Sequence, residues 1–334
     1  MSADESILLE CTPDRVYDPL LRDLELSCVQ VFYPYGFPLK VSSNSPHILA
    51  AASKSFGHFE QVSNEPPLDL EVLVTGDNDG PEPIPPTIRT RRHLVTLSSD
   101  SGHFGSCDFE TGSAVLWLTP KILQDQARLR YFFLETMGYL LVTERYLAPV
   151  HASCVALNGS AVLLCGPSTA GKSTLAYACA RRGFTYISDD GSHLVRDATD
   201  RVVTGNCNAF RFRPSAATLF PELGELPAIR RANGKMAIEV DVQTLGLTNL
   251  ANRCRVDHVV FLNRQPIGSA SLASFPGDLA RAEMEMSYTY GRDQSIFEQR
   301  AAVGRLIDRD IVELTYSDLD SAVDTLENLL RGAL

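Results

Sequence analysis

The chain has 334 residues, of which 44% are hydrophobic and 21% are charged. This length is sufficient for a full hydrophobic core and favours two domains in a soluble globular protein. Acidic residues outnumber basic residues by 41 to 30, which gives a formal net charge of −11 at pH 7. A nucleic-acid binder needs a basic surface, so we expect no nucleic-acid partner.

The cysteines and the first residues indicate where the protein works. Eight cysteines are scattered along the chain without a C-x-x-C pair, which is neither a disulfide framework nor a zinc site. The chain starts with the acidic Met-Ser-Ala-Asp-Glu-Ser, where a signal peptide would be basic. The most apolar stretch, residues 131–142, is too short to span a membrane and contains Glu135. We therefore expect a cytoplasmic protein with no membrane partner.

Residues 1–118 predict a strand-rich α+β N-terminal domain, to which the sequence assigns no role. Ser45 followed by Pro46 predicts the start of one helix in this domain. Residues 76–86 are rich in Gly, Pro and Asp, a composition typical of a loop. Short apolar and β-branched runs predict strands at 25–33, 37–42, 69–75, 88–97, 104–109 and 113–118.

A basic cluster lies within the fourth of these predicted strands. It consists of Arg89, Arg91, Arg92 and His93, and it runs against the acidic charge of the chain as a whole. The alternation of these residues with Thr90 predicts a solvated strand face. A docking site for an acidic partner is the alternative.

Residues 119–149 predict one long helix that bridges the two parts of the chain. Thr119 before Pro120 is a capping pattern, and apolar residues from Leu123 to Leu141 recur at helical spacing. Residues 150–334 then alternate between strands and helices, with expected strands at 256–262 and 311–316 and a hairpin at 193–204. A final helix is expected to be capped by Ser317 and to end at Gly332.

A complete G-x-x-x-x-G-K-[ST] motif opens this second part, and it is the most specific signal in the chain. It follows an apolar strand-like run at 160–165 and precedes a helical segment at 173–182. Strand, glycine-rich loop and helix in this order predict a site for ATP. The expected binding residues are Gly166, Pro167, Ser168, Thr169, Ala170, Gly171, Lys172, Ser173 and Thr174.

Each residue type in the motif suits phosphate. Gly166 and Gly171 lack a Cβ, so the backbone can turn successive N–H groups toward a polyanion, and the helix N-terminus adds its positive dipole. Lys172 is expected to reach the β- and γ-phosphates, and the Ser173 hydroxyl to ligate Mg²⁺. Thr174 is expected to pack within the helix. The alternative is a glycine-rich turn that binds nothing.

Two adjacent carboxylates, Asp189 and Asp190, end the next predicted strand. Neighbouring residues on a strand point to opposite sides, so one carboxylate can hold Mg²⁺ while the other accepts a proton from an incoming hydroxyl. The sequence does not decide which carboxylate has which role. An acidic turn ending in Gly191 is the alternative without chemistry.

Residues 151–262 resemble the C-terminal catalytic domain of the HPr kinase/phosphorylase family and its related proteins. The resemblance lies in the strand that starts at His151, in the loop and its helix, and in the Arg-Gly before the Asp-Asp pair. It implies an α/β fold, a P-loop-containing kinase domain similar to HPr kinase and phosphoenolpyruvate carboxykinase. It also implies that His151 supports the acidic pair Asp189 and Asp190, which supplies the base and a metal contact.

The sequence departs from this family at Arg211-Phe-Arg213-Pro, where the family has Glu-Ile-Arg-Gly with the glutamate on metal. Only Arg213 corresponds, and it is expected to meet charge in the transition state, alone or with Arg211. An arginine in place of the glutamate would repel a second cation, so phosphorolysis is not expected. Surface charge is the alternative for both arginines, and Gly291-Arg292-Asp293 only faintly resembles the family's phosphorolysis loop.

These features predict an ATP- and Mg²⁺-dependent kinase that acts on a hydroxyl, the expected acceptor being a serine or threonine of a peptide or small protein. A small-metabolite kinase is the second candidate, because neither the loop nor the carboxylates report the size of the acceptor. A scaffold that senses ATP without transferring phosphate is the third, because the metal-binding glutamate is missing. Homo-oligomerisation is left open.

Overall fold

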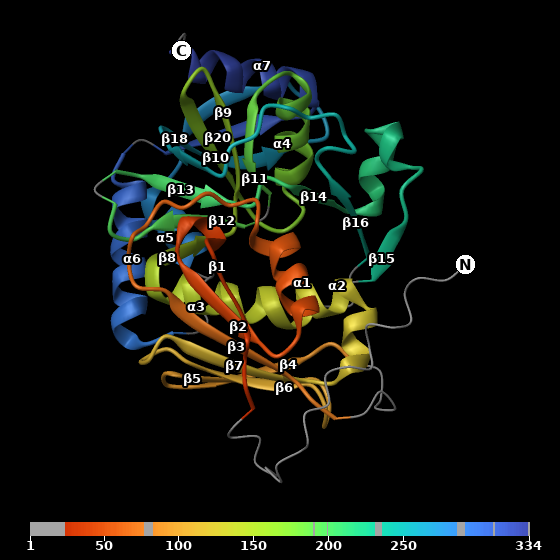
Figure 1. Ribbon diagram of the computed structural model, residues 1–334. Helices are drawn as coiled ribbons and strands as arrows, with labels where there is room; N and C mark the ends of the chain where they lie inside the picture. The colour runs from red at the N-terminus through yellow and green to blue at the C-terminus, as the bar shows by residue number, and fades with distance from the viewer. Residues whose placement is uncertain are drawn as a thin grey trace.

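The computed structural model describes residues 24–76, 83–189, 191–198, 200–230, 236–285, 291–309 and 311–332. These residues form a mixed α/β structure with four sheets. Figure 1 shows the first half of the chain, red to yellow, below the second half, green to blue. Asp190 lies outside the described residues, so its role stays a prediction.

The first half is built on a seven-stranded sheet in the order β1-β2-β3-β7-β6-β5-β4. Its strands are β1 (Cys28–Phe32), β2 (Leu39–Ser43), β3 (Leu68–Val74), β4 (Thr87–Arg91), β5 (Leu94–Ser98), β6 (Phe104–Asp108) and β7 (Ser113–Leu118). Strands β2, β3 and β7 run parallel, and the other neighbours run antiparallel. In β5, Val95 and Leu97 are buried while their neighbours are exposed, which is the alternation of a sheet with one covered face.

Helices α1 (Pro46–Phe56) and α3 (Glu135–Tyr146) supply the apolar residues that pack on this sheet. Ser45 stands at the N-cap position of α1 as expected, but its side chain makes no capping hydrogen bond. The expected single strand at 88–97 is wrong, because β4 and β5 form a hairpin that turns at Arg92, which has a φ of 56°. All of β4 is exposed, so Arg89 and Arg91 do lie on a solvated strand.

The segment 119–149 is not one helix. A 3₁₀ turn (Pro120–Gln124), the short α2 (Gln126–Arg128), a π-helical turn η3 (Leu129–Leu134) and α3 follow one another before strand β8 (Leu147–Val150). Thr119 is the N-cap of the 3₁₀ turn but makes no side-chain capping hydrogen bond, and its hydroxyl is bonded to His103 Nε2 at 3.0 Å. Asp125 instead starts α2, and its carboxylate accepts from the Arg128 backbone N–H at 3.0 Å.

The described residues of the second half form three sheets, one of which also includes β8. The six-stranded sheet has the order β11-β9-β10-β18-β20-β19, and the smaller sheets have the orders β17-β13-β12-β8 and β14-β16-β15. The strands are β9 (Ser153–Leu157), β10 (Ser160–Cys165), β11 (Thr185–Ser188), β12 (Ser192–Val195), β13 (Val202–Gly205), β14 (Ala209–Phe212), β15 (Ala228–Arg230), β16 (Met236–Asp241), β17 (Arg253–Arg255), β18 (His258–Arg264), β19 (Ser271–Ser274) and β20 (Ile311–Tyr316). The hairpin expected at 193–204 is therefore the β12–β13 pair.

Helices cover both faces of the six-stranded sheet. Helices α4 (Lys172–Arg181) and α7 (Leu319–Leu330) pack into one apolar cluster with it. Helices α5 (Gly277–Glu285) and α6 (Asp293–Ile307) pack into the cluster on the other face. The expected Ser317 cap of α7 is wrong: Asp318 is the N-cap and accepts from the Ser321 backbone N–H at 2.8 Å.

The two halves meet through rings and polar contacts. The Tyr35 ring lies 4.4 Å from the His193 ring between centroids, and the Thr204 hydroxyl donates to the Tyr35 carbonyl at 3.3 Å. The Asn252 side-chain amide donates to the His58 carbonyl at 3.0 Å. A cavity of about 420 Å³, lined by residues from both halves, lies beside these contacts.

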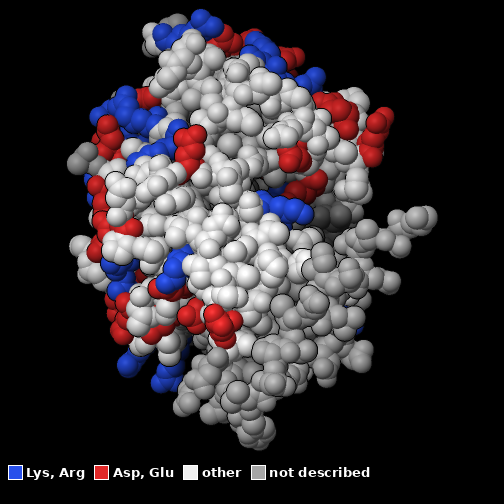
Figure 2. Space-filling model, in the orientation of Figure 1, with Lys and Arg blue, Asp and Glu red and all other residues white. Residues whose placement is uncertain are grey.

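The surface carries charges of both signs. Figure 2 shows Lys and Arg interspersed with Asp and Glu over one face, with uncharged residues between them. The described atoms of this face thus gather into no single basic patch, in agreement with the acidic composition. Among the helices in the described ranges, none combines the length and apolar character needed to cross a membrane.

Candidate active site

The glycine-rich loop lies between β10 and α4, as its sequence predicts. Gly166 and Gly171 have φ values of 132° and 97°, a region that favours glycine. Thr169 also has a positive φ, 90°, which is strained for a β-branched residue. The backbone therefore curls sharply between the buried strand and the first turn of the helix.

A side chain at either glycine would crowd its neighbours. A Cβ on Gly171 would lie 2.6 Å from the Tyr316 hydroxyl oxygen, and a Cβ on Gly166 would lie 3.1 Å from the Ala170 Cβ. The Tyr316 hydroxyl donates to the Ala170 carbonyl at 3.1 Å, so the last residue of β20 holds the loop in place. The loop is thus a supported turn rather than a free surface segment.

Lys172 is the first residue of α4 and is 5% exposed. Its Nζ donates to the loop carbonyls of Gly166 at 2.7 Å and Pro167 at 3.3 Å. The ammonium group is therefore held inside the curve of the loop. Pro167, Ser168 and Thr169 are exposed, and Ala170, Ser173 and Thr174 are half-buried.

The start of α4 suits an anion. Gly171 occupies the N-cap position and has no side chain to satisfy the first helical N–H groups. These donors and the helix dipole favour negative charge at this end. The described loop thus combines a curled backbone, a helix N-terminus and a buried lysine.

The ends of several strands meet at the edge where this loop lies. Strand β9 pairs antiparallel with both β10 and β11, so β10 and β11 run in the same direction, and β18 and β20 run parallel to β10. Ligands of open α/β sheets bind at the carboxyl ends of such strands. The loop, Asp189 and Tyr316 all belong to this edge, because each follows or ends one of these strands.

Asp189 is fixed by two donors. The Ser153 hydroxyl donates to its Oδ1 at 3.2 Å, and the Arg211 backbone N–H donates to its Oδ2 at 3.0 Å. Ser153 pairs with Leu164, two residues before the loop begins, so β9 connects the carboxylate to the strand that leads into the loop. The half-buried carboxylate is thus oriented at the loop edge of the sheet.

His151 is not on the strand where it was expected. It lies in the turn between β8 and β9 and is exposed. Its predicted support of the acidic pair stays a prediction, since Asp190 is outside the described residues. The Ser153 hydroxyl, two residues later, donates to the Asp189 carboxylate.

The two arginines of β14 and its end have different surroundings. Arg213 is exposed, and its Nη2 donates to the Ser168 hydroxyl of the loop at 3.0 Å. Arg211 pairs across the sheet with Glu239, with Nε 3.3 Å from Oε2. Arg213 is thus the arginine that reaches the loop, and the positive charge of Arg211 is offset by Glu239. Because Glu239 carries the opposite charge, it also reduces the repulsion that Arg211 was expected to exert on a second cation.

Glu239 also connects the site to the first half of the chain. The Tyr131 hydroxyl, on the π-helical turn η3, donates to Glu239 Oε1 at 2.7 Å. Burial and this hydrogen bond raise the pKa of Tyr131 to about 12, so the phenol keeps its proton. A π-helical turn often marks a functional position, and here it carries the residue that meets Glu239.

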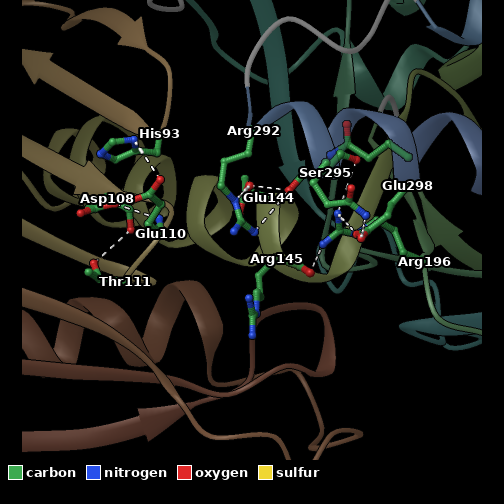
Figure 3. A network of polar contacts seen from close by, with 12 residues as sticks. His93, Asp108, Glu110, Thr111, Glu144, Arg145, Arg196, Arg292, Ser295 and Glu298 are labelled. Carbon is green, nitrogen blue, oxygen red and sulfur yellow. Dashed lines mark hydrogen bonds and ion pairs between the residues drawn. The ribbon is translucent and has the colours of Figure 1, made fainter.

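Arg292 contacts Glu144 and Ser295. Figure 3 shows it beside Glu144 of α3, and the Arg292 Nε lies 2.7 Å from Glu144 Oε1. The Ser295 hydroxyl donates to the same oxygen at 2.5 Å, and Glu144 is only 1% exposed. In the structure, Arg292 of the segment 291–293 thus forms a partly buried ion pair that joins the start of α6 to α3.

Three site residues, Ser153, Tyr316 and Glu239, were missed by the sequence predictions. Tyr316 ends a strand that the sequence predicted. If that strand was assumed to run parallel to the strand before the loop, Tyr316 could have been placed at the loop edge. Ser153 follows His151 by two residues, but nothing in the local sequence indicates that its hydroxyl meets Asp189. Glu239 gave no signal, because its partner strand β14 is 24 or more residues earlier in the chain.

The fold and the site define an α/β protein with a supported glycine-rich loop at the carboxyl edge of its sheet. No family model and no curated protein matches the chain. Among solved structures, the HPr(Ser) kinase/phosphatase from Coxiella burnetii matches over 55% of this chain and 89% of its own, with 14% identity and a TM-score of 0.31. A TM-score at this level carries no functional weight, so the function proposed below rests on the geometry of the site.

Proposed function

We propose that this protein is an ATP- and Mg²⁺-dependent kinase that transfers the γ-phosphate to a hydroxyl, with a serine or threonine of a peptide or small protein as acceptor. One observation carries the proposal. The loop curls around the buried Lys172 ammonium at the same sheet edge that presents the oriented carboxylate of Asp189. Phosphoryl transfer needs these elements: donors for phosphate charge and a carboxylate for metal or proton.

Lys172 and Arg213 supply the positive charge. The donors of Lys172 rest on the Gly166 and Pro167 carbonyls, and bound phosphate oxygens would accept those hydrogen bonds instead. Arg213 rests on Ser168 at the rim of the loop and is exposed, so it is available to the outermost phosphate. Fixed charges of this kind stabilise the transition state more than the ground state.

The residues at this edge also suit Mg²⁺, which prefers oxygen ligands. Ser173 of the first helical turn and the carboxylates Asp189 and Asp190 would hold it, and the ion would neutralise phosphate charge when bound. The Ser153 hydroxyl and the Arg211 backbone N–H orient the Asp189 carboxylate, so its geometry does not depend on a ligand. One of the two carboxylates would accept the proton of the acceptor hydroxyl.

A transfer experiment with γ-labelled ATP tests the proposal. The purified protein is incubated with ATP, Mg²⁺ and cell extract, and the label is followed into protein and small-molecule fractions. Label in a protein fraction, lost with Lys172→Ala, supports the proposal. Label in small molecules indicates the metabolite kinase. Nucleotide binding without transfer indicates the sensing scaffold.

A further inference from the structure

Two cysteine side chains touch close to Asp189 of the candidate active site, since one of them, Cys154, follows Ser153 and pairs with Ser188. Cys154 lies on β9 of the six-stranded sheet, and Cys254 lies on β17 of the four-stranded sheet. Their sulfur atoms are 3.5 Å apart, although the residues are 100 positions apart in the chain. Both are free thiols in the structure. The pair therefore joins a strand of one sheet to a strand of another.

The two thiols differ in accessibility. Cys154 is fully buried, whereas Cys254 is partly exposed. The hydrogen bond with Cys254 and then burial raise the pKa of Cys154 well above its ordinary value, so this thiol rarely ionises. A reagent from solvent therefore reaches Cys254 first, and the buried Cys154 is shielded from it.

We propose that Cys154 and Cys254 form an oxidisable modification site, which a hydroperoxide converts from two thiols to a disulfide. The Cys254 sulfur attacks one peroxide oxygen, the O–O bond breaks, and a sulfenic acid forms while the other oxygen leaves as water or an alcohol. The Cys154 sulfur then attacks the Cys254 sulfur, the S–O bond breaks, and the hydroxyl leaves as water. The thiols lose two electrons and two protons in total, and the peroxide is reduced.

We expect closure of this bond to shift β9, the strand that carries Ser153. The sulfur atoms must approach from 3.5 Å to roughly 2.05 Å. Cys154 is adjacent to Ser153, whose hydroxyl orients Asp189, and it pairs with Ser188, the residue before Asp189. A displacement on the order of 1 Å at a catalytic group can lower a rate by about 10²-fold. We therefore expect the disulfide to inhibit transfer, a consequence that rests on the proposed function.

The test uses the purified full chain treated with hydrogen peroxide under non-denaturing conditions. Free thiols are counted after denaturation, and peptide mapping identifies any linked pair. The reduced protein has eight cysteines, so two fewer thiols and a Cys154–Cys254 peptide pair are expected after oxidation. Cys154→Ala and Cys254→Ser should each abolish the linkage, and Cys28→Ser, a partly exposed cysteine of β1, should retain it.

The experiment has two arms: thiol counting with peptide mapping tests the disulfide, and a turnover assay tests its effect on the proposed kinase activity. A linked pair other than Cys154–Cys254, or eight thiols that survive peroxide, would overturn the proposal. In the second arm, ATP turnover should fall on oxidation by about tenfold or more and recover with dithiothreitol, in the wild type but not in Cys254→Ser. Thiol counts and mapping do not require turnover, so a protein with no kinase activity would still report the disulfide.

Discussion

Both halves of the molecule contain parallel strands whose carboxyl ends share one edge, yet the two edges differ in how their polar groups are satisfied. In the first half, Asn44 after β2 exchanges two hydrogen bonds with the Val74 backbone of β3, each 2.9 Å long. Thr119 after β7 is bonded to the buried His103. In the second half, the edge instead holds a curled loop, a lysine on its carbonyls and an exposed arginine.

This difference separates structural from functional polar groups. Groups that satisfy each other across strand ends close an edge and fix the sheet, because a buried polar atom needs a partner. Groups that rest on carbonyls or a hydroxyl at an accessible edge can exchange those partners for a ligand. Matched substitutions in the two halves can therefore test the contrast.

The largest effect is expected from Lys172→Ala. Loss of the ammonium should lower phosphoryl transfer by about 10³-fold or more and greatly weaken ATP binding, because the charge acts on phosphate. Turnover and an ATP titration on the folded variant provide the measurement. Lys54→Ala, an exposed lysine on α1, is the matched control and should change neither. Unchanged ATP affinity in Lys172→Ala would show that the edge in the second half does not bind ATP through this lysine, and would contradict its functional role.

Asp189→Asn should lower turnover by about 10²-fold, and a Mg²⁺ titration should show which role the carboxylate has. A metal ligand would raise the Mg²⁺ requirement, whereas a base would lower turnover at saturating Mg²⁺. Asp69→Asn on β3, which breaks an ion pair with Lys40, serves as the first-half control. Wild-type turnover of Asp189→Asn at every Mg²⁺ concentration would identify the acidic pair as a turn.

Arg213→Ala should lower turnover by about 10²-fold if the guanidinium meets transition-state charge. Arg89→Ala, on the exposed strand β4, should have no effect on turnover. Steady-state kinetics on both variants show whether Arg213 acts in transfer from its place beside Ser168 or contributes only surface charge, as Arg89 does. Equal kinetics for the two variants would show that Arg213 is surface charge only.

Tyr316→Phe should have a smaller effect. It removes one hydrogen bond to the Ala170 carbonyl, a loss of about 1 kcal/mol, while the ring keeps its packing. We expect ATP to bind about fivefold more weakly because the loop is less restrained. Nucleotide titration measures this, with Tyr33→Phe of the first half as the control. Tighter ATP binding in Tyr316→Phe would contradict a supporting role of the hydroxyl.

The smallest effect concerns stability and pH. Burial lowers the pKa of His193, at the junction of the halves, to about 4. Between about pH 6.5 and 4 the unfolded chain binds the extra proton, so stability falls as pH falls and is fully present above pH 6.5. His193→Phe should reduce this slope by up to about 1.4 kcal/mol per pH unit, measured by urea unfolding at several pH values. His47→Gln, exposed on α1, should leave the slope unchanged.

The sequence predicted local features better than partners distant in the chain. The strand, loop and helix at 160–181 follow from apolar runs and glycines that lie next to one another. The strands of the first half were found for the same reason, except where β4 and β5 were joined. There the turn at Arg92 carries no glycine, so the usual turn signal was absent.

The misses at the site share a physical cause. Contacts such as Ser153 with Asp189, Tyr316 with Ala170 and Arg211 with Glu239 depend on strand order and register. No local pattern encodes that β9 lies between β10 and β11. Capping failed for a related reason, because Thr119 has a competing tertiary partner in His103, which spacing alone does not reveal.

The contact between Tyr35 and His193 bears on how the molecule melts. Tyr35 is 6% exposed, and its ring touches Phe59 and Tyr139 in its own half as well as His193 in the other. Separation of the halves would open an aromatic cluster to water, at a cost of about 0.5–1.5 kcal/mol per lost ring pair beyond the area exposed. Neither half can therefore unfold without weakening the other, and heat should denature both in one cooperative transition.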